Sequence, residues 1–477
     1  MLIAVVLAPL AFAALAFLAP WSRVRSWLVP AGAVAHSALT LAALTLRSGP
    51  QLGGWLVLDP LGRLILSFLS TLFLISSFYV PRYLEERGSR PNRVFTGALL
   101  VFLAAMSAMV MSHHLGLMWV TIEAATLSAA PLLYFDRNAR SLEAIWKYLM
   151  VGSVGIAIAL LGSFFLAYSA LQSGLGSSLL FEDLVREAPR LSKPWLRSGF
   201  VLLLVGYGTK MGLAPMHSWK PDAYGEAPGI AGALLAGGLT NCAFVAVLRF
   251  VQICQAAGEI ELTRKLLVAM GLLSMSVAAA FVIRQQDYKR MLAYSSVEHM
   301  GILSFGVGLG GLGASAAVYH MINNGLGKGV LFLAAGNLHR AYGSKLTNDV
   351  AGAVRRLPGT GPLLLAGFFA ITGAPPFGPF MSELMIVKAA FSTGHFVGGA
   401  IFLSALGLVF AGMGATVLSM ALGKPPRKDT RSQYRESLAT VGPPLVFLVL
   451  VFMMGVYVPP PVARLMAEAS AFLEVAK

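Results

Sequence analysis

Charged residues and cysteines are both scarce in this chain of 477 residues. Charged residues make up 12% of it, about half of the roughly 25% that soluble domains carry, so the composition excludes a soluble globular protein. The two cysteines, Cys242 and Cys254, are too few and too isolated for an iron–sulfur cluster or a disulfide framework. Neither the phosphate-binding loop of ATPases nor a dinucleotide-binding fingerprint occurs in the sequence.

Apolar residues, by contrast, are abundant. They make up 57% of the chain, and a membrane-spanning helix needs about 20 of them in succession. Polar interruptions divide the sequence into fourteen such runs. We therefore expect an all-α polytopic membrane protein with spans at approximately 2–20, 27–46, 58–80, 95–112, 115–135, 147–171, 198–216, 227–250, 265–283, 291–310, 314–336, 361–390, 399–421 and 441–461.

The basic residues are distributed unevenly between the two sets of loops. If the N-terminus lies outside, 22 of the 36 Lys and Arg fall in or beside inside loops, including the strongly basic loop 422–440, and nine fall outside. This excess follows the positive-inside rule, so it predicts that both termini lie outside. It also accounts for the net charge of +15 without a nucleic-acid partner. Five cations remain within spans: Arg63, Lys210, Arg249, Lys328 and Lys388.

Two related sets of five helices occupy the middle of the chain. Each set has a Gly/Pro interruption in its fourth helix, KMGLAPMH in residues 94–250 and ITGAPPFGPF in residues 264–422. Five is an odd number of crossings, so the second set enters from the opposite side, as in the inverted repeats of ion-coupled transporters. Residues 1–93 add three helices before the sets, and residues 440–477 add one helix and a tail.

A carboxylate and an ammonium group mark the first set. Glu123 lies in the apolar run LGLMWVTIEAATL, where burying its charge costs about 2.5 to 3.5 kcal/mol. Lys210, just before the first interruption, is its natural complement. A pair balanced between charged and neutral forms can take up or release a proton when a neighbouring charge moves. A static ion pair that joins two helices is the alternative interpretation.

The second set offers the side-chain types that a proton relay needs. His320 and Lys328 are eight residues apart in HMINNGLGKGVLF, which places them on one helix face, and Glu383 follows the second interruption. The alternative for His320 is a core histidine with satisfied hydrogen bonds. His217 and His299 could pass protons to the inside surface, or each could make a single hydrogen bond at the interface.

Four segments resemble blocks of a known family. They are TKMGLAPMHSWKPDAYGEAPGIAGALLAG, DYKRMLAYSSVEHMGI, HMINNGLGKGVLFLAAGNL and FFAITGAPPFGPFMSE. Together they resemble the antiporter-like membrane subunits of respiratory complex I, membrane-bound nickel–iron hydrogenases, formate hydrogenlyase and multisubunit Na⁺/H⁺ antiporters. RSLEAIWKYLMVGSVGIAIALL and LTNCA look closest to the F-type subunit of hydrogenase-4. The resemblance implies a fourteen-helix core with two inverted five-helix units, each containing a broken helix.

The resemblance also implies roles for individual residues. Glu123 and Lys210 match the charge pair that drives proton movement in the family, Lys328 matches the central lysine, and His320 matches the first of two paired histidines. Glu383 matches the acidic residue of the second broken helix. The remaining matches lie in the connecting segment and would shape an inside vestibule: His217, Asp222 and Glu226.

Two positions depart from the family pattern. Asn241 stands where the eighth helix often has a lysine, and Asn324 stands where the second paired histidine would be. An amide can hold a water molecule but cannot release a proton at neutral pH. The connection between the two halves therefore needs water or Lys328 to bridge it.

The leading hypothesis is a proton-translocating subunit of a membrane-bound redox complex of the hydrogenase or NADH-quinone oxidoreductase type. We expect no catalytic residues and no cofactor in this chain, with iron–sulfur and nickel–iron centres in partner subunits, and a location in a bacterial or archaeal cytoplasmic membrane. The alternatives are a secondary cation/proton antiporter or inorganic-carbon uptake subunit without a redox partner, and a transport-inactive membrane anchor. The sequence does not separate H⁺ from Na⁺ as the transported ion.

Overall fold

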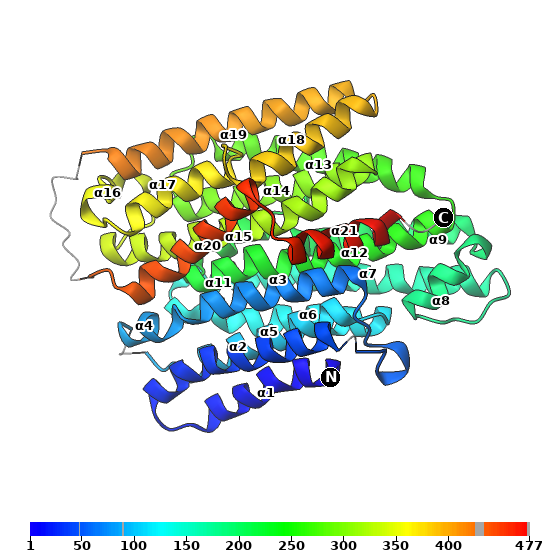
Figure 1. Cartoon of the computed structure of the whole chain (residues 1–477), viewed down its shortest axis with the longest axis horizontal. Coiled ribbons are helices and arrows are strands. Elements are labelled where there is room, and N and C mark those ends of the chain that lie inside the picture. Colours follow the sequence, from blue (N-terminus) through cyan, green and yellow to red (C-terminus); the bar gives the residue numbers. More distant parts are fainter. Residues whose placement is uncertain (47, 88–89, 425–433, 475–477) are drawn as a thin grey trace.

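The computed structural model describes residues 1–46, 48–87, 90–424 and 434–474, and within these ranges it contains helices and no strand. The helices run roughly parallel to one axis of the molecule, and the two termini lie at the same end (Figure 1). The uninterrupted long helices are α1 (Leu2–Leu18), α2 (Ser22–Thr45), α3 (Pro60–Ser77), α5 (Arg93–Met111), α6 (Leu115–Leu133), α7 (Ala139–Leu171), α13 (Ile260–Val282), α14 (Tyr288–Leu309), α15 (Leu312–Tyr342), α19 (Phe396–Leu422) and α20 (Leu438–Val456).

Three further segments consist of helices in series. A break separates α9 (Lys193–Met211) from α10 (Trp219–Glu226), and another separates α17 (Thr360–Ile371) from α18 (Gly378–Ser392). The third segment is continuous and joins α11 (Gly229–Leu234), a π-helical turn (Leu235–Leu239) and α12 (Thr240–Ala256). Short connecting helices are α4 (Val80–Glu85), α8 (Phe181–Arg186) and α16 (Ala353–Arg356), and α21 (Pro460–Glu474) ends the described chain.

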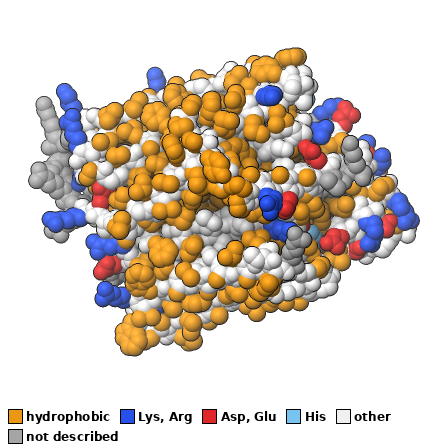
Figure 2. All heavy atoms as spheres, viewed as in Figure 1, with side chains coloured by type: hydrophobic (Ala, Val, Ile, Leu, Met, Phe, Trp, Pro, Cys, Tyr) orange, Lys and Arg blue, Asp and Glu red, His pale blue; other side chains and the backbone are white. Residues whose placement is uncertain are grey.

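The surface is that of a membrane protein. Among the described helices, nine are long and apolar enough to cross a membrane by length and composition. Hydrophobic side chains cover the middle of the molecule, whereas charged side chains gather chiefly at its two ends (Figure 2). The chain is an integral multi-pass membrane protein, and the count of fourteen spans remains a prediction.

Both Gly/Pro interruptions predicted from the sequence break their helices. α9 ends at Gly212, which has a positive φ of 77°, and α17 is followed by Gly373, with a φ of 67°. Glycine adopts this left-handed conformation without the strain that a side chain adds. The two breaks leave half-helices facing the interior of the bundle, where polar side chains can reach their freed backbone groups.

The structure differs from the expected boundaries in several places. α7 begins at Ala139 instead of 147, and α15 ends at Tyr342 instead of 336. Residues 217–226 are expected as an inside loop, but Trp219–Glu226 form α10, which packs against α7 and α14. The last span ends at Val456 instead of 461, and the expected tail forms α21, which packs against α3 and α15. Three consecutive prolines at 459–461 account for this separation, since proline cannot continue a helix but fits its first turn. Residues 425–433 of the basic loop 422–440 lie outside the described residues.

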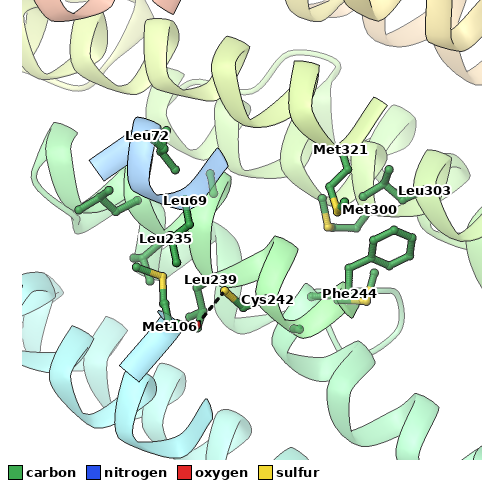
Figure 3. Close-up of a cluster of buried hydrophobic side chains, with 14 of the residues drawn as sticks. Leu69, Leu72, Met106, Leu235, Leu239, Cys242, Phe244, Met300, Leu303 and Met321 are labelled. Atoms are coloured by element: carbon green, nitrogen blue, oxygen red, sulfur yellow. Dashed lines mark hydrogen bonds between the residues drawn. The ribbon is translucent and has the colours of Figure 1, made fainter. Parts of the chain in front are cut away.

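The segment 229–256 lies at the centre of the bundle and has no exposed residue in its membrane-spanning window. Apolar side chains surround it on two sides (Figure 3). Leu69 of α3 and Met106 of α5 pack near Cys242, whose thiol lies 3.9 Å from the Met106 carbonyl oxygen. On the other side Phe244 faces a group from α14 and α15 that comprises Met300, Leu303 and Met321.

Candidate functional site

Glu123 of α6 and Lys210 of α9 form an ion pair, with 3.6 Å between Nζ and Oε2. Lys210 is fully buried, whereas the Glu123 side chain keeps 19% of its surface exposed. The Lys210 ammonium also donates to the Thr126 hydroxyl at 2.6 Å, and Ser153 donates to the Glu123 carboxylate at 2.7 Å. Each charged group therefore has a neutral partner in addition to the other charge, so the pair can separate without leaving either group bare.

Helix α7 shapes the space around the Lys210 ammonium. The Tyr148 ring lies 5.6 Å from Nζ, within the range of a cation–π interaction. A Cβ atom at Gly152 would lie 2.6 Å from the same nitrogen. Only glycine at this position therefore leaves the ammonium where it can reach both Glu123 and Thr126.

The break after Lys210 leaves few backbone groups without partners. Trp219 Nε1 donates to the Thr209 carbonyl at 2.9 Å, and the Ala214 amide donates to the Ser274 hydroxyl at 2.9 Å. The Met211 carbonyl accepts from the Lys220 ammonium at 2.6 Å. Side chains thus replace the helical hydrogen bonds that the break removes.

Lys220 is a buried cation to which the sequence patterns assigned no role. It lies near the start of α10, has no exposed surface, and also approaches the Ser296 carbonyl of α14 at 3.4 Å. Its segment HSWKPDAYGE looks like a polar loop in the sequence, which hid the burial. Among the described residues no carboxylate lies within ion-pair distance of it.

Lys328 occupies the middle of α15, the helix that contacts α14, α17, α18 and α20. Its ammonium donates to the Ser295 hydroxyl at 2.7 Å and approaches the Leu292 carbonyl at 3.4 Å. Glu298, one helical turn further along α14, is also buried and lies close enough to interact electrostatically with Lys328. Sequence reasoning gave Glu298 no role, although it directly precedes His299.

Two histidines, His299 of α14 and His320 of α15, connect these polar groups with α18. His299 Nδ1 lies 2.8 Å from His320 Nε2, and the two rings stack. The other His320 nitrogen, Nδ1, lies 2.8 Å from the Ser382 hydroxyl. Glu383 is the next residue, and its carboxylate packs so closely against Gly373 of the second break that a Cβ there would collide with it. The structure thus brings His299, His320 and Glu383 together.

This cluster is the only group of three potential metal ligands identified within the described residues, with all ligand atoms within 4.8 Å of one another. Two nitrogens bound to one tetrahedral zinc ion at about 2.0–2.1 Å would lie roughly 3.4 Å apart. The histidine nitrogens are closer than this, at 2.8 Å, and share a hydrogen bond. This hydrogen-bonded geometry differs from that of two histidines on one zinc ion.

Asp222 and Glu226 line a polar cavity of about 450 Å³ at the end of α7 and α10. Asp222 accepts from Lys147 at 2.8 Å and pairs with Arg290 at 3.1 Å, and Glu226 pairs with Lys345. These ion pairs give the cavity a charged lining. His217 is only half-buried, and its ring lies 6.3 Å from that of Tyr294. It belongs neither to the Glu123–Lys210 pair nor to the cluster of His299, His320 and Glu383.

Asn241 and Asn324 are both buried near the middle of the bundle. Asn241 donates to the Met321 carbonyl at 3.2 Å, and its oxygen has no hydrogen-bond partner among protein groups. Neither amide atom of Asn324 has such a partner. Both are therefore polar side chains in an apolar region, and among the described residues neither forms a hydrogen bond to a lysine.

A second buried ion pair lies at the end of the bundle away from the cavity. Arg249 of α12 is fully buried, and its Nη2 contacts Asp59 at 3.0 Å and donates to the Val110 carbonyl at 2.7 Å. Its Nη1 donates to the Ser112 carbonyl at 2.7 Å, and its Nε donates to Asp59 at 3.3 Å. His113 Nε2 shares the same carboxylate oxygen at 2.8 Å. Because all three nitrogens of this guanidinium donate to fixed acceptors, we interpret Arg249 as structural.

Comparison with known proteins agrees with this architecture. Residues 112–410 match the family described as NADH:quinone oxidoreductase/Mrp antiporter, TM. A "Hydrogenase-4 component F homolog" of Methylacidiphilum infernorum is 35% identical over 468 residues, which cover 95% of each chain.

Two solved structures share the fold. A chain of the membrane-bound sulfane sulfur reductase, an archaeal respiratory membrane complex, superposes with a TM-score of 0.89 at 22% identity, covering 100% of this chain and 97% of the other. A chain of the Mrp complex from Dietzia sp. gives 0.86 at 18% identity, covering 100% and 98%. The protein whose buried charges are described above therefore belongs to the NADH:quinone oxidoreductase/Mrp antiporter transmembrane family, as an antiporter-like membrane subunit.

Proposed function

We propose that this chain translocates protons as a subunit of a membrane-bound redox complex of the hydrogenase or NADH-quinone oxidoreductase type. The observation that carries the proposal is the succession of buried titratable groups across the bundle. It begins at Glu123 and Lys210, continues at Lys328, and ends at His320 and Glu383. Buried ionisable groups in a membrane protein are costly unless they serve a pathway.

Charge movement in a partner would act first on the Glu123–Lys210 pair. An added charge near Glu123 changes the attraction across 3.6 Å, and the Lys210 ammonium can then shift toward the Thr126 hydroxyl. The shift alters the field at the next cation, so a proton moves there in turn. The polar cavity at Asp222 and Glu226 supplies protons from the inside surface.

The test is Lys210→Met in the assembled complex reconstituted into vesicles. We expect electron transfer to continue and proton translocation to fall at least tenfold. Lys388→Met is the matched control, because Lys388 is a lysine of α18 that lies on the exposed face. Normal proton translocation by the Lys210→Met complex would refute the proposal, since no other described cation pairs with Glu123.

The second candidate function is cation/proton antiport without a redox partner, favoured by the match to the Mrp antiporter family. Proton flux that requires Na⁺ and proceeds without an electron donor would support it. An inactive membrane anchor predicts instead that neither Lys210→Met nor removal of Na⁺ changes any flux.

For the whole assembly we propose further membrane subunits and a peripheral redox arm that holds the iron–sulfur and nickel–iron centres. We also propose a cytoplasmic-membrane location with both termini outside, on the basis of the uneven distribution of Lys and Arg. The position of the two termini at one end of the bundle is consistent with this orientation. Accessibility labelling of a cysteine placed near residue 2 in intact cells tests the orientation.

A further inference from the structure

The proposed path has a gap between Lys210 and Lys328. Asn241 and Asn324 lie near this part of the bundle, but an amide does not release a proton at neutral pH. Apolar side chains pack around the helix α12 that carries Asn241 (Figure 3). A titratable side chain on another path would close this gap.

Lys220 lies in the position that the connection requires. Its ammonium donates to the carbonyl of Met211, the residue after Lys210, and approaches the carbonyl of Ser296. The neighbouring residue, Ser295, accepts a hydrogen bond from Lys328 at 2.7 Å. The Lys220 nitrogen thus contacts the carbonyl of the residue that follows Lys210 and the carbonyl of the residue that follows the Lys328 acceptor.

The surroundings of Lys220 differ from those of a structural cation. Arg249, which we interpret as structural, has a carboxylate partner at 3.0 Å, whereas Lys220 contacts main-chain carbonyls and has no carboxylate within 4 Å among the described residues. A permanent charge in such a place is expensive. The positive charges of Lys220 and Lys328 also repel each other, so the two lysines do not readily carry a proton at the same time.

The first break provides the space for this side chain. Gly212 has a positive φ of 77°, and a Cβ atom there would lie 2.5 Å from the Lys220 Cδ. The break therefore does two things at once. It frees the Met211 carbonyl, and it opens a passage for the Lys220 stem from α10 to that carbonyl.

We propose that Lys220 carries the proton between Lys210 and Lys328, an inference that rests on the proposed function and names its missing link. In each cycle the neutral Lys220 amine accepts one proton from the Lys210 ammonium. It then gives one proton to the neutral Lys328 amine and returns to the neutral form. One proton and one positive charge move in each step, and no electron or other atom is transferred.

The test compares Lys220→Gln and Lys220→Arg with Lys388→Gln in the assembled complex. Glutamine keeps a hydrogen-bond donor for the Met211 carbonyl, and arginine keeps both donor and charge but does not release its proton. We expect both Lys220 variants to assemble and to transfer electrons while proton translocation falls at least tenfold. The exposed control should translocate normally.

A purely structural role gives a different result. If Lys220 only satisfies the Met211 carbonyl, at least one donor-bearing variant translocates normally, which overturns the inference. Failure of both variants to assemble also assigns a structural role and overturns it. Lys210→Met is measured in parallel. Loss of translocation in that variant alone rejects Lys220 as the link but keeps the proposed function, whereas normal translocation in all three variants rejects both.

Discussion

Gly152→Ala tests the Glu123–Lys210 pair without removing either charge. The new methyl group would lie 2.6 Å from the Lys210 nitrogen, so the ammonium must move by about 1 Å to reach ordinary contact distance. Lengthening the 3.6 Å ion pair by this amount lowers the Coulomb attraction by about 1 kcal/mol at an effective dielectric constant of about 20. Strain or loss of the hydrogen bond to Thr126 adds roughly 1.5 to 3 kcal/mol.

The expected result is a fall in proton translocation of at least about fivefold, the equivalent of about 1 kcal/mol, at an unchanged rate of electron transfer. Weakening of α7 does not explain such a fall, because alanine stabilises a helix interior relative to glycine by about 0.5–1 kcal/mol. The measurement is the number of protons moved per electron in reconstituted vesicles.

The matched control is Gly407→Ala in α19, where the added Cβ has no atom within 4 Å. We expect the control to translocate protons normally. If Gly152→Ala translocates as well as the unmodified complex, the position of the Lys210 ammonium does not limit translocation and the reasoning is refuted. An equal loss in both variants would point to a general effect of alanine and would refute it too.

Two further substitutions address other parts of the bundle. Gly373→Ala places a methyl group against the Glu383 carboxylate at a residue with a φ of 67°, so we expect a severalfold loss of proton translocation in the assembled complex. Arg249→Met leaves Asp59 buried without its cation and should destabilise the chain by about 3–5 kcal/mol, measured as a lower midpoint of thermal unfolding in detergent. Arg249→Met together with Asp59→Leu should recover much of that loss, and a single variant as stable as the original chain would contradict the structural role.

The breaks and the first charge pair were predictable because each depends on local sequence. Glycine and proline mark an interruption wherever they occur in an apolar run, and a carboxylate in such a run calls for a cation. Lys210 is the lysine that the first set of helices offers just before its interruption. The structure places its ammonium nitrogen 3.6 Å from the Glu123 carboxylate. The assignment of these residues to proton translocation stays a prediction.

Lys220 and the helix α21 could not be found in the same way. Lys220 is buried because α7 and α14 pack against α10, although the sequence of α10 is itself polar. Both helices are distant from α10 in the sequence. α21 is amphipathic and begins at the second of three consecutive prolines, so it merges with the preceding apolar run when only hydropathy is considered. The contact between His299 and His320 likewise depends on how α14 and α15 pack.

Three of the buried cations share an order along the chain that bears on how the protein enters the membrane. Lys210 binds Glu123 and Thr126, Arg249 binds Asp59, and Lys328 binds Ser295; in each case the acceptor comes earlier in the sequence. Synthesis proceeds from the N-terminus, so each of these acceptors is already made when its cation leaves the ribosome. During co-translational insertion, each of these three cations can therefore bind an acceptor that is already in the membrane and need not be exposed to lipid.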